Sequence, residues 1–426
     1  MKLEKYQIEG ASFLAKRKHA LLADDMGLGK TAQAITACDM LELKNILVVC
    51  PASVKGHWED EFEKWSTYAN FIHKVESARY RVDPDANIVI VNYDMLLKDL
   101  VFKDLIAREW DVLICDEAHY LKTLTSERSK RTLGKFGLVQ RATYKWLLTG
   151  TPIQNRPVDL FPMLYVLNRK ALGRYDDFEK FVMYFCDGYY DRHTNQPRAH
   201  GSSNEKELAK SLEGFMLRRT LENELPETTV QVVRLKKEIS LEKIESKIQD
   251  QEDFLFKPMD ELGALASLRQ EIALAKMQQC VNYIKDTLKT IDKVVVFAYH
   301  RAVISGVADK LKQFKPVKFY GGLTSKQREE AKDKFINDPK CKVFIGQLTA
   351  AGTGLDGLQK VCHHMIFVEI DWSPYRQCIG RLKRKGQKKD KVIVQILVCK
   401  DSMEEAMLGT VKSKLNDIDN ILGDKK

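Results

Sequence analysis

A glycine-rich run near the amino terminus has the residue types that bind a nucleotide phosphate. Residues 24–31 read Asp-Asp-Met-Gly-Leu-Gly-Lys-Thr, after an apolar stretch at 20–23 and before an amphipathic run at 31–43. In such a turn backbone N–H groups face phosphate oxygens, Lys30 reaches the β- and γ-phosphates and the Thr31 hydroxyl ligates Mg²⁺. Because Asp24 stands where the general pattern has its first glycine, the run alone also fits an ordinary tight turn.

Two adjacent acids supply the other half of a nucleotide-hydrolysis site. Asp116 and Glu117 directly follow the apolar run 112–115. The carboxyl ends of strands are where open α/β sheets bind ligands. Asp116 suits a Mg²⁺ ion, and Glu117 suits the attacking water. Acids after a single strand are often only a solvated loop, but together with the upstream turn they predict ATP hydrolysis.

Two arginines near the carboxyl end are candidates for stabilising charge on a transferred γ-phosphate. Arg381 and Arg384 are spaced three residues apart, so a helix would place both on one face, aimed at the first lobe. The alternative is that residues 376–391 are a solvated basic surface.

Other clusters give weaker signals. Arg218 and Arg219 fit either a structural or a nucleotide-linked role, and the residues leave that open. Cys362, His363 and His364 are adjacent and lack the spacing of tetrahedral zinc ligands, so we do not expect zinc.

Short β-branched runs between helical patterns must position these motifs. They cover 46–50, 88–91, 112–115, 146–148, 294–298, 317–320, 343–345, 366–368 and 392–398. Near-continuous apolar strands alternating with helices predict parallel sheets buried on both faces. Between the two groups the pattern is helical and aromatic-rich over 157–225, strand-like over 229–235 and helical over 240–288. The sequence therefore predicts an α/β protein with two parallel-sheet lobes and short helical insertions.

Composition favours an intracellular protein with a polyanionic partner. The 426 residues are 44% hydrophobic and 30% charged, a globular balance that suggests two or three domains. The net charge of +10 favours a polyanion, although basic surfaces are also common on proteins without such a partner. The nine cysteines form no Cys-x-x-Cys pair, which predicts reduced core thiols. With no secretory signal and no apolar run of membrane-spanning length, we expect a soluble protein.

Several motifs, in the correct order, resemble those of Swi/Snf-type (Snf2-family) DNA translocases of helicase superfamily two. They are DMGLGKT at 25–31, DEAH at 116–119, LTGTPIQN at 148–155, FAYH at 297–300, AAGTGLDGL at 350–358 and QCIGRLKRKGQ at 377–387. The FAYH segment has some likeness to the annealing-helicase branch. Asp24 agrees with the family, whereas Asp25 stands where the family usually has Glu and Lys383 where it often has His. The resemblance implies two RecA-like lobes, residues 1–225 and 226–426.

The resemblance also implies roles for residues at matching positions. Catalytic roles fall on Lys30, Asp116, Glu117, Gln377, Arg381 and Arg384. Contacts to ATP fall on Gln7, Asp25, Met26, Gly27, Leu28, Gly29, Lys30, Thr31, Gly354 and Asp356, with Thr31 and Asp116 as Mg²⁺ ligands. Nucleic-acid contacts fall on Ser53, Lys55, Trp58, Asn92, Tyr93, Thr149, Gly150, His300, Gly321, Thr349 and Gly352.

We expect a DNA-dependent ATPase that translocates on double-stranded DNA and remodels or anneals DNA structures or displaces bound proteins. The alternatives are a strand-separating DNA or RNA helicase and a nucleotide-dependent binding scaffold. The intact Lys30, Asp116, Glu117, Arg381 and Arg384 disfavour the scaffold, and the lack of an evident wedge hairpin disfavours the helicase. Expected cofactors are ATP and Mg²⁺. Expected partners are double-stranded or branched DNA and a recruiting protein, with no membrane and a monomeric state. We expect an intracellular, DNA-associated location in cytoplasm or nucleus, which is also compatible with a virus-encoded protein.

Overall fold

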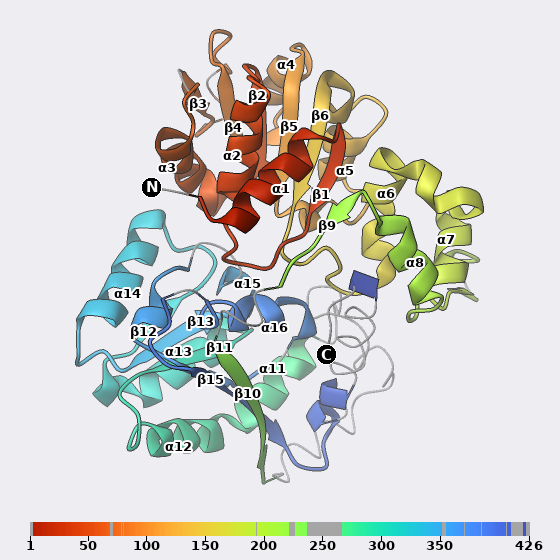
Figure 1. Cartoon of the computed structure of the whole chain (residues 1–426). Helices are drawn as coiled ribbons and strands as arrows, with labels where there is room; N and C mark the ends of the chain where they lie inside the picture. Colours follow the sequence, from red (N-terminus) through yellow and green to blue (C-terminus); the bar gives the residue numbers. More distant parts are fainter. Residues whose placement is uncertain are drawn as a thin grey trace. The chain divides into compact units, whose positions relative to one another are not determined.

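The computed structural model describes residues 3–68, 71–77, 79, 81–192, 194–220, 226–236, 266–351, 355–369, 371–384, 386–405, 407–409 and 421–422. The chain divides into two compact units. The first comprises Met1–Thr220 with Asn416–Lys426, and the second comprises Leu221–Leu415. Figure 1 labels most of the helices and strands of both units.

The first unit is built on a sheet of seven parallel strands in the order β3-β4-β2-β5-β6-β1-β9. The strands are β1 (His19–Leu22), β2 (Ile46–Cys50), β3 (Ile72–Lys74), β4 (Ile88–Asn92), β5 (Trp110–Asp116), β6 (Ala142–Leu148) and β9 (Met216–Leu217). The four first-lobe strand runs predicted from sequence are confirmed as β2, β4, β5 and β6. At the centre, Val48 pairs with Ile90 on one side and Ile114 on the other.

Helices cover both faces of this sheet, because alternate strand residues face opposite sides. On one face Val48 joins a core with α1 (Lys5–Ala15), α2 (Lys30–Met40) and α3 (Lys55–Trp65). On the other face Leu47 and Val49 join a core with α4 (Asp99–Ile106) and α5 (Glu127–Leu133). This arrangement confirms a parallel sheet that is buried on both faces.

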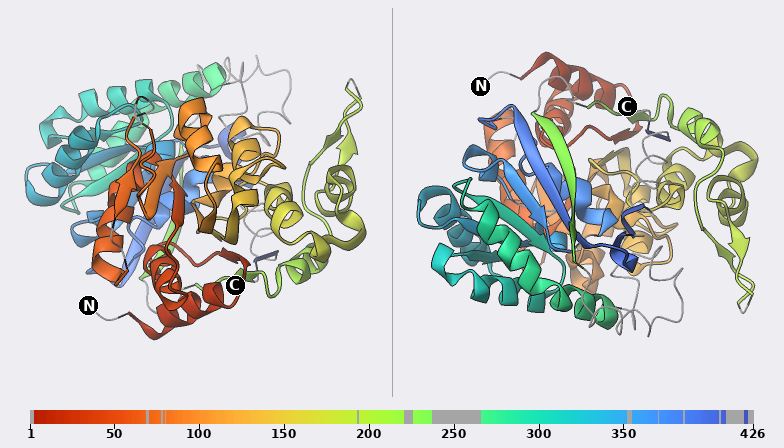
Figure 2. Two further views of the ribbon diagram at one scale, coloured as in Figure 1. Left: turned by 90° about the horizontal axis from the view of Figure 1, so that it is seen from above. Right: turned by 90° about the horizontal axis from the view of Figure 1, so that it is seen from below.

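The helical, aromatic-rich insertion follows β6. It contains α6 (Phe161–Leu167), α7 (Phe178–Phe185) and α8 (Glu205–Leu212). Phe161, Phe181 and Phe185 pack ring against ring within it. Between α7 and α8, β7 (Tyr189–Tyr190) and β8 (Pro197–Arg198) form an antiparallel hairpin that projects from the insertion (Figure 2). The last predicted residues of this stretch, 221–225, lie outside the described part of the chain.

The second unit has a sheet of six parallel strands in the order β10-β15-β14-β11-β13-β12. The strands are β10 (Glu227–Leu235), β11 (Val294–Ala298), β12 (Val317–Phe319), β13 (Val343–Gln347), β14 (His364–Phe367) and β15 (Lys391–Cys399). Figure 2 shows β10 running alongside β15, and their pairing extends from Glu227 opposite Lys391 to Leu235 opposite Cys399. These strands confirm the second predicted lobe.

Helices also cover both faces of the second sheet. Val294 and Val296 face a core with α11 (Ala266–Ala275), α12 (Met277–Thr287) and α13 (Arg301–Lys310). Val295 and Phe297 face a core with α14 (Ser325–Asn337) and α16 (Trp372–Ile379). The short α15 (Leu348–Ala351) follows β13. The helical pattern predicted over 240–288 is seen as α11 and α12, whereas 240–265 lies outside the described residues.

All nine cysteines are free and buried, as the prediction of core thiols requires. Among the residues that the structure describes, no helix combines the length and apolarity needed to cross a membrane.

Candidate nucleotide-hydrolysis site

The glycine-rich turn joins β1 to the amino terminus of α2. Gly27 and Gly29 both have left-handed backbone angles, with φ of 85° and 69°. Gly29 caps α2, so Lys30 is the first helical residue. A Cβ atom at Gly29 would lie 2.4 Å from Nε2 of Gln7, so the Gln7 amide would have to shift, and the left-handed backbone itself favours glycine. A glycine turn that opens directly into a helix fits a phosphate group, because its N–H groups and the helix dipole both favour an anion.

Lys30 lies across this turn. Its Nζ donates to the backbone oxygens of Asp24 at 2.7 Å and of Asp25 at 3.2 Å. Both acceptors are uncharged, so a phosphate can compete for the ammonium with the stronger charge-assisted bond. Thr31 follows in the first turn of α2 and is half-buried. The N–H groups of this turn and the Lys30 ammonium therefore fit a nucleotide phosphate, and the Thr31 hydroxyl oxygen fits its cation.

The side chain of Asp116 is fixed at the end of β5. Its Oδ2 accepts from Nε1 of Trp58 at 2.9 Å, and its Oδ1 accepts from the backbone N–H of Glu117 at 2.9 Å. The hydroxyl of Tyr93 donates to the backbone oxygen of Asp116 at 2.9 Å. Burial, followed by repulsion from Glu117, raises the pKa of Asp116 to about 6, while the Trp58 bond and the charge of Lys30 lower it. The influence of Lys30 on this carboxyl shows that the two motifs share one electrostatic environment.

Glu117 links this strand end to the residues after β6. Its Oε2 lies 3.2 Å from Nδ1 of His119 and 3.5 Å from the hydroxyl of Thr149. The Thr149 hydroxyl also lies 3.1 Å from His119 Nδ1 and accepts from the backbone N–H of Thr151 at 3.1 Å. Glu117 itself has a left-handed backbone with φ of 49°, a strained conformation for a non-glycine residue. Such strain persists where the surroundings hold a functional side chain in place.

The segment after β6 also lies against the glycine-rich turn of residues 24–31, which we call the phosphate turn. A Cβ atom at Gly150 would lie 3.0 Å from Cγ of Met26 and 3.4 Å from Nζ of Lys30. The first unit therefore brings together the predicted residues Lys30, Glu117 and Gly150, although they belong to three separate segments.

The residues of the first unit with predicted nucleic-acid roles differ in their exposure. Ser53 is exposed, but the side chains of Lys55, Trp58, Asn92, Tyr93 and Thr149 are buried, and so is Gly150. Trp58 and Tyr93 donate hydrogen bonds to Asp116, and Lys55 donates to the backbone oxygen of Val75 at 2.6 Å. The nucleic-acid roles of all these residues stay predictions.

The two second-unit arginines do not lie together on a helix. Helix α16 holds Gln377 but ends at Ile379, so Arg381 and Arg384 lie in the turns that follow. Gly380 comes directly after the helix, and glycine is a poor helix former. Arg381 is buried and its Nη1 donates to the backbone oxygen of Leu355 at 3.3 Å.

The remaining second-unit predictions are spread over several loops. Arg384 pairs with Asp356, and desolvation lowers the pKa of Arg384. His300 precedes α13, with Nδ1 2.6 Å from Oε1 of Glu369. The N–H of Gly321 donates to the Gln347 side chain at 2.9 Å. Thr349 is exposed on α15, whereas Gly352 and Gly354 lie outside the described residues.

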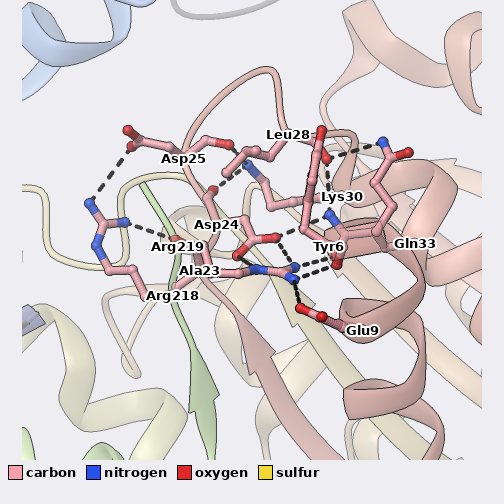
Figure 3. Close-up of polar contacts among 11 residues, drawn as sticks. Tyr6, Glu9, Ala23, Asp24, Asp25, Leu28, Lys30, Gln33, Arg218 and Arg219 are labelled. Atoms are coloured by element: carbon pink, nitrogen blue, oxygen red, sulfur yellow. Dashed lines mark hydrogen bonds and ion pairs between the residues drawn. The ribbon is translucent and has the colours of Figure 1, made fainter. Parts of the chain in front are cut away.

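Sequence reasoning missed several residues that shape the site. Trp58 and His119 stand inside recognised motifs but were not expected to support Asp116 and Glu117. Arg218 and Arg219 were left undecided, and the structure places both against the phosphate turn (Figure 3).

Comparison with known proteins matches both parts of the chain. The SNF2-related domain matches residues 6–290, and the helicase conserved C-terminal domain matches residues 275–386. The human DNA annealing helicase and endonuclease ZRANB3 is 28% identical over 451 residues, covering 100% of this chain and 41% of that protein. The Caenorhabditis elegans homologue of SWI/SNF-related matrix-associated actin-dependent regulator of chromatin subfamily A-like protein 1 is 29% identical over 441 residues, covering 96% of this chain and 60% of that protein. The chain thus spans less than two thirds of either relative.

A solved structure of the Sulfolobus solfataricus SWI2/SNF2 ATPase core in complex with double-stranded DNA is also similar. It is 25% identical, with coverage of 99% of this chain and 93% of that one and a TM-score of 0.46.

Proposed function

The chain belongs to the SNF2-related domain family, and from this premise we propose that it is a DNA-dependent ATPase that translocates on double-stranded DNA. On that DNA it remodels or anneals branched structures or displaces bound proteins. The observation that carries the ATPase proposal is the convergence of the glycine turn, the acid pair and the segment after β6 within the first unit.

Each part of this arrangement has a role in ATP hydrolysis. The N–H groups of residues 25–31 and the ammonium of Lys30 hold the phosphates, and Gln7 reads the adenine. Thr31 and Asp116 hold Mg²⁺, which when bound offsets phosphate charge. Glu117 orients the attacking water and takes up its proton, and Thr149 and His119 keep that carboxylate in place.

The second lobe completes the reaction in this proposal. We assign residues 1–225 and 226–426 to two RecA-like lobes. The guanidinium groups of Arg381 and Arg384 stabilise charge on the γ-phosphate, as an arginine finger does. Gln377, Gly354 and Asp356 contribute to the nucleotide site from the same lobe.

Duplex DNA is the proposed track. The printed names of the relatives speak of a DNA annealing helicase and a chromatin regulator. The net charge of +10 suits phosphate contacts, which carry no base sequence information. The proposed contacts are Ser53, Lys55, Trp58, Asn92, Tyr93, Thr149, Gly150, His300, Gly321, Thr349 and Gly352. We expect non-specific binding that weakens steeply with salt through counterion release. A monomeric state, a recruiting protein and an intracellular location belong to the same proposal.

Two motor assays test the proposal against its alternative. ATP hydrolysis should rise strongly with duplex or forked DNA and little with RNA. Displacement of a triplex-forming third strand reports tracking along a duplex, and release of a strand from a tailed duplex reports unwinding. We expect third-strand displacement that requires hydrolysable ATP and vanishes in Glu117→Gln. Robust unwinding of the tailed duplex without third-strand displacement would instead establish a strand-separating helicase.

A further inference from the structure

The chain leaves the first unit along the phosphate turn. Strand β9 pairs with β1 at the edge of the sheet, where the N–H of Ala23 donates to the backbone oxygen of Leu217 at 2.7 Å. The same ladder continues beyond β1, because the N–H of Asp25 donates to the backbone oxygen of Arg219 at 3.0 Å. The backbone of residues 217–219 is therefore fixed to the turn itself, and it delivers two arginine side chains there.

Arg219 grips the residue that replaces the first glycine of the general phosphate-binding pattern. Its Nε donates to Oδ1 of Asp24 at 3.0 Å, and its Nη2 donates to Oδ2 of the same carboxylate. Asp24 has no exposed surface, so its charge is compensated within the protein. Such a two-pronged pair between guanidinium and carboxylate is strong and also fixes the orientation of both groups.

Arg219 also joins two neighbouring elements to this pair (Figure 3). Its Nη1 donates to the backbone oxygen of Tyr6, and its guanidinium carbon lies 5.6 Å from the centre of the Tyr6 ring. Its Nη2 donates to Oε1 of Gln33 in α2 at 2.8 Å. The amide of Gln33 in turn donates to Oδ2 of Asp24 at 3.1 Å and to the backbone oxygen of Leu28 at 3.0 Å. One guanidinium thus connects α1, the turn and α2.

Arg218 contacts the residues on both sides of Asp24 and the segment after β6. Its Nη1 donates to the backbone oxygen of Ala23 at 2.8 Å and lies 3.4 Å from that of Gly150, and its Nη2 lies 3.7 Å from the Asp25 carboxylate. These contacts support the same geometry with weaker bonds.

We propose that Arg219 is a positioning residue for ATP binding, which it supports by holding the phosphate turn in its binding shape through Asp24. This inference rests on the proposed ATPase function. In this inference Asp24 stands in place of a glycine because its ion pair with Arg219 fixes the start of the turn. A turn that is already ordered binds ATP without first losing conformational freedom. Loss of the anchor should therefore weaken ATP binding more than it slows the chemical step.

A purely structural ion pair is the competing explanation, and it predicts a different pattern. Arg219→Gln leaves the buried Asp24 carboxylate without its cation, so lower stability is expected in either case. In Asp24→Asn with Arg219→Gln, the only charge that loses its partner is the exposed carboxylate of Glu9, so stability should largely return. Neutral amides do not reproduce the two-pronged geometry, so a positioning role predicts that ATP affinity stays low in this double variant.

The test measures KM and kcat for ATP with saturating duplex DNA, the Kd of a fluorescent ATP analogue with Mg²⁺, and unfolding by urea. For Arg219→Gln we expect KM and Kd to rise about tenfold or more, with kcat changing by less than about threefold. Arg219→Lys keeps the positive charge but cannot form the two-pronged hydrogen bond to Asp24, so it should give an intermediate KM with nearly normal stability. The matched control is Arg141→Gln, which breaks an exposed pair with Glu109 and should leave all three measurements unchanged.

Two results would overturn the inference. One is a wild-type KM in both Arg219 variants while the wild-type protein hydrolyses ATP. The other is recovery of KM in step with stability in the double variant. A wild-type protein that binds the analogue but hydrolyses no ATP would instead overturn the proposed function, and analogue binding would still test the role of Arg219.

Discussion

The indole Nε1 of Trp58 donates a hydrogen bond to Oδ2 of Asp116 at 2.9 Å. Trp58 belongs to α3 and has no exposed surface, whereas Asp116 is half-buried, so the donor side of the bond is shielded from water. A donor facing a buried carboxylate favours its charged form. Trp58 therefore helps to keep the proposed Mg²⁺ ligand ionised although burial opposes its charge.

Replacing Trp58 by Phe should raise the Mg²⁺ concentration needed for half-maximal ATP hydrolysis by about tenfold, because the carboxylate loses one charge-stabilising bond. A Mg²⁺ titration of ATPase activity at constant ATP measures this. Trp65→Phe is the matched control, since the Trp65 indole donates to Glu61 in the same helix and does not contact Asp116. An unchanged Mg²⁺ requirement in Trp58→Phe would contradict the role given to Trp58.

The Mg²⁺ requirement should also depend on pH. Burial and the charge of Glu117 raise the pKa of Asp116 from the ordinary 3.8 to about 6. Above that pH the carboxylate is ionised and can ligate Mg²⁺, and below it the proton competes with the metal. The raised pKa also means that the ionised carboxylate lowers stability above pH 6, a cost that fades as the pH falls toward 3.8. Mg²⁺ titrations between pH 5.5 and 7.5 should show a rising requirement below about pH 6, and a flat profile would contradict this.

Two substitutions should separate ATP binding from ATP turnover. Lys30→Ala should lose productive ATP binding, because the turn loses its cation for the phosphates. Glu117→Gln should keep ATP binding and lose turnover by about a hundredfold or more, because an amide cannot accept the proton of the attacking water. Binding of a fluorescent nucleotide and steady-state hydrolysis measure the two effects. Near-wild-type turnover in either variant would refute the assignment of that residue.

Thr149→Val should lower kcat about tenfold without changing ATP affinity, because it removes the hydroxyl between Glu117 and His119 while keeping the side-chain shape. Thr132→Val is the control, since it removes another fully buried hydroxyl that donates only to a helix backbone oxygen. DNA-saturated kcat and nucleotide Kd are the measurements. If the two variants behave alike, the Thr149 bridge has no special role in turnover.

Arg381→Ala and Arg384→Ala should each lower kcat by about a hundredfold or more while DNA affinity stays largely intact, as expected for arginine fingers. Lys388→Ala removes an exposed charge from the same basic segment and serves as the comparison. Measurements of duplex binding and of DNA-saturated ATP hydrolysis distinguish an arginine finger from a basic surface. Loss of DNA binding with a preserved kcat would mean that these arginines form a basic surface.

The central strands were predictable because their residues face apolar layers on both sides. The runs 46–50 and 294–298 coincide with β2 and β11, and all ten of their residues are buried. The edge strand β9 escaped prediction, since two residues carry no periodic pattern and the backbone of β1 holds them in place. The three-residue spacing of Arg381 and Arg384 was no guide to a helix, because α16 ends at Ile379.

In the candidate site, too, the residues in local motifs were predictable and those that act through tertiary contacts were not. Lys30, Asp116 and Glu117 were identified because their chemistry is written into local motifs. The role of Arg219 was not visible, because it depends on a carboxylate 195 residues earlier in the chain. The role of Trp58 could not be inferred either, since burial and the direction of an indole N–H are set by tertiary packing.

Because every cysteine is buried, the native protein has no accessible thiol that would react with a labelling reagent. Burial raises the pKa of the Cys50, Cys115 and Cys378 thiols far above neutrality, so the reactive thiolate is scarce as well as shielded. A cysteine introduced at an exposed position outside the proposed sites, such as Thr290, should therefore accept a maleimide dye while the native thiols stay unmodified. Site-specific fluorophores can thus follow this protein on DNA without the prior removal of any natural cysteine.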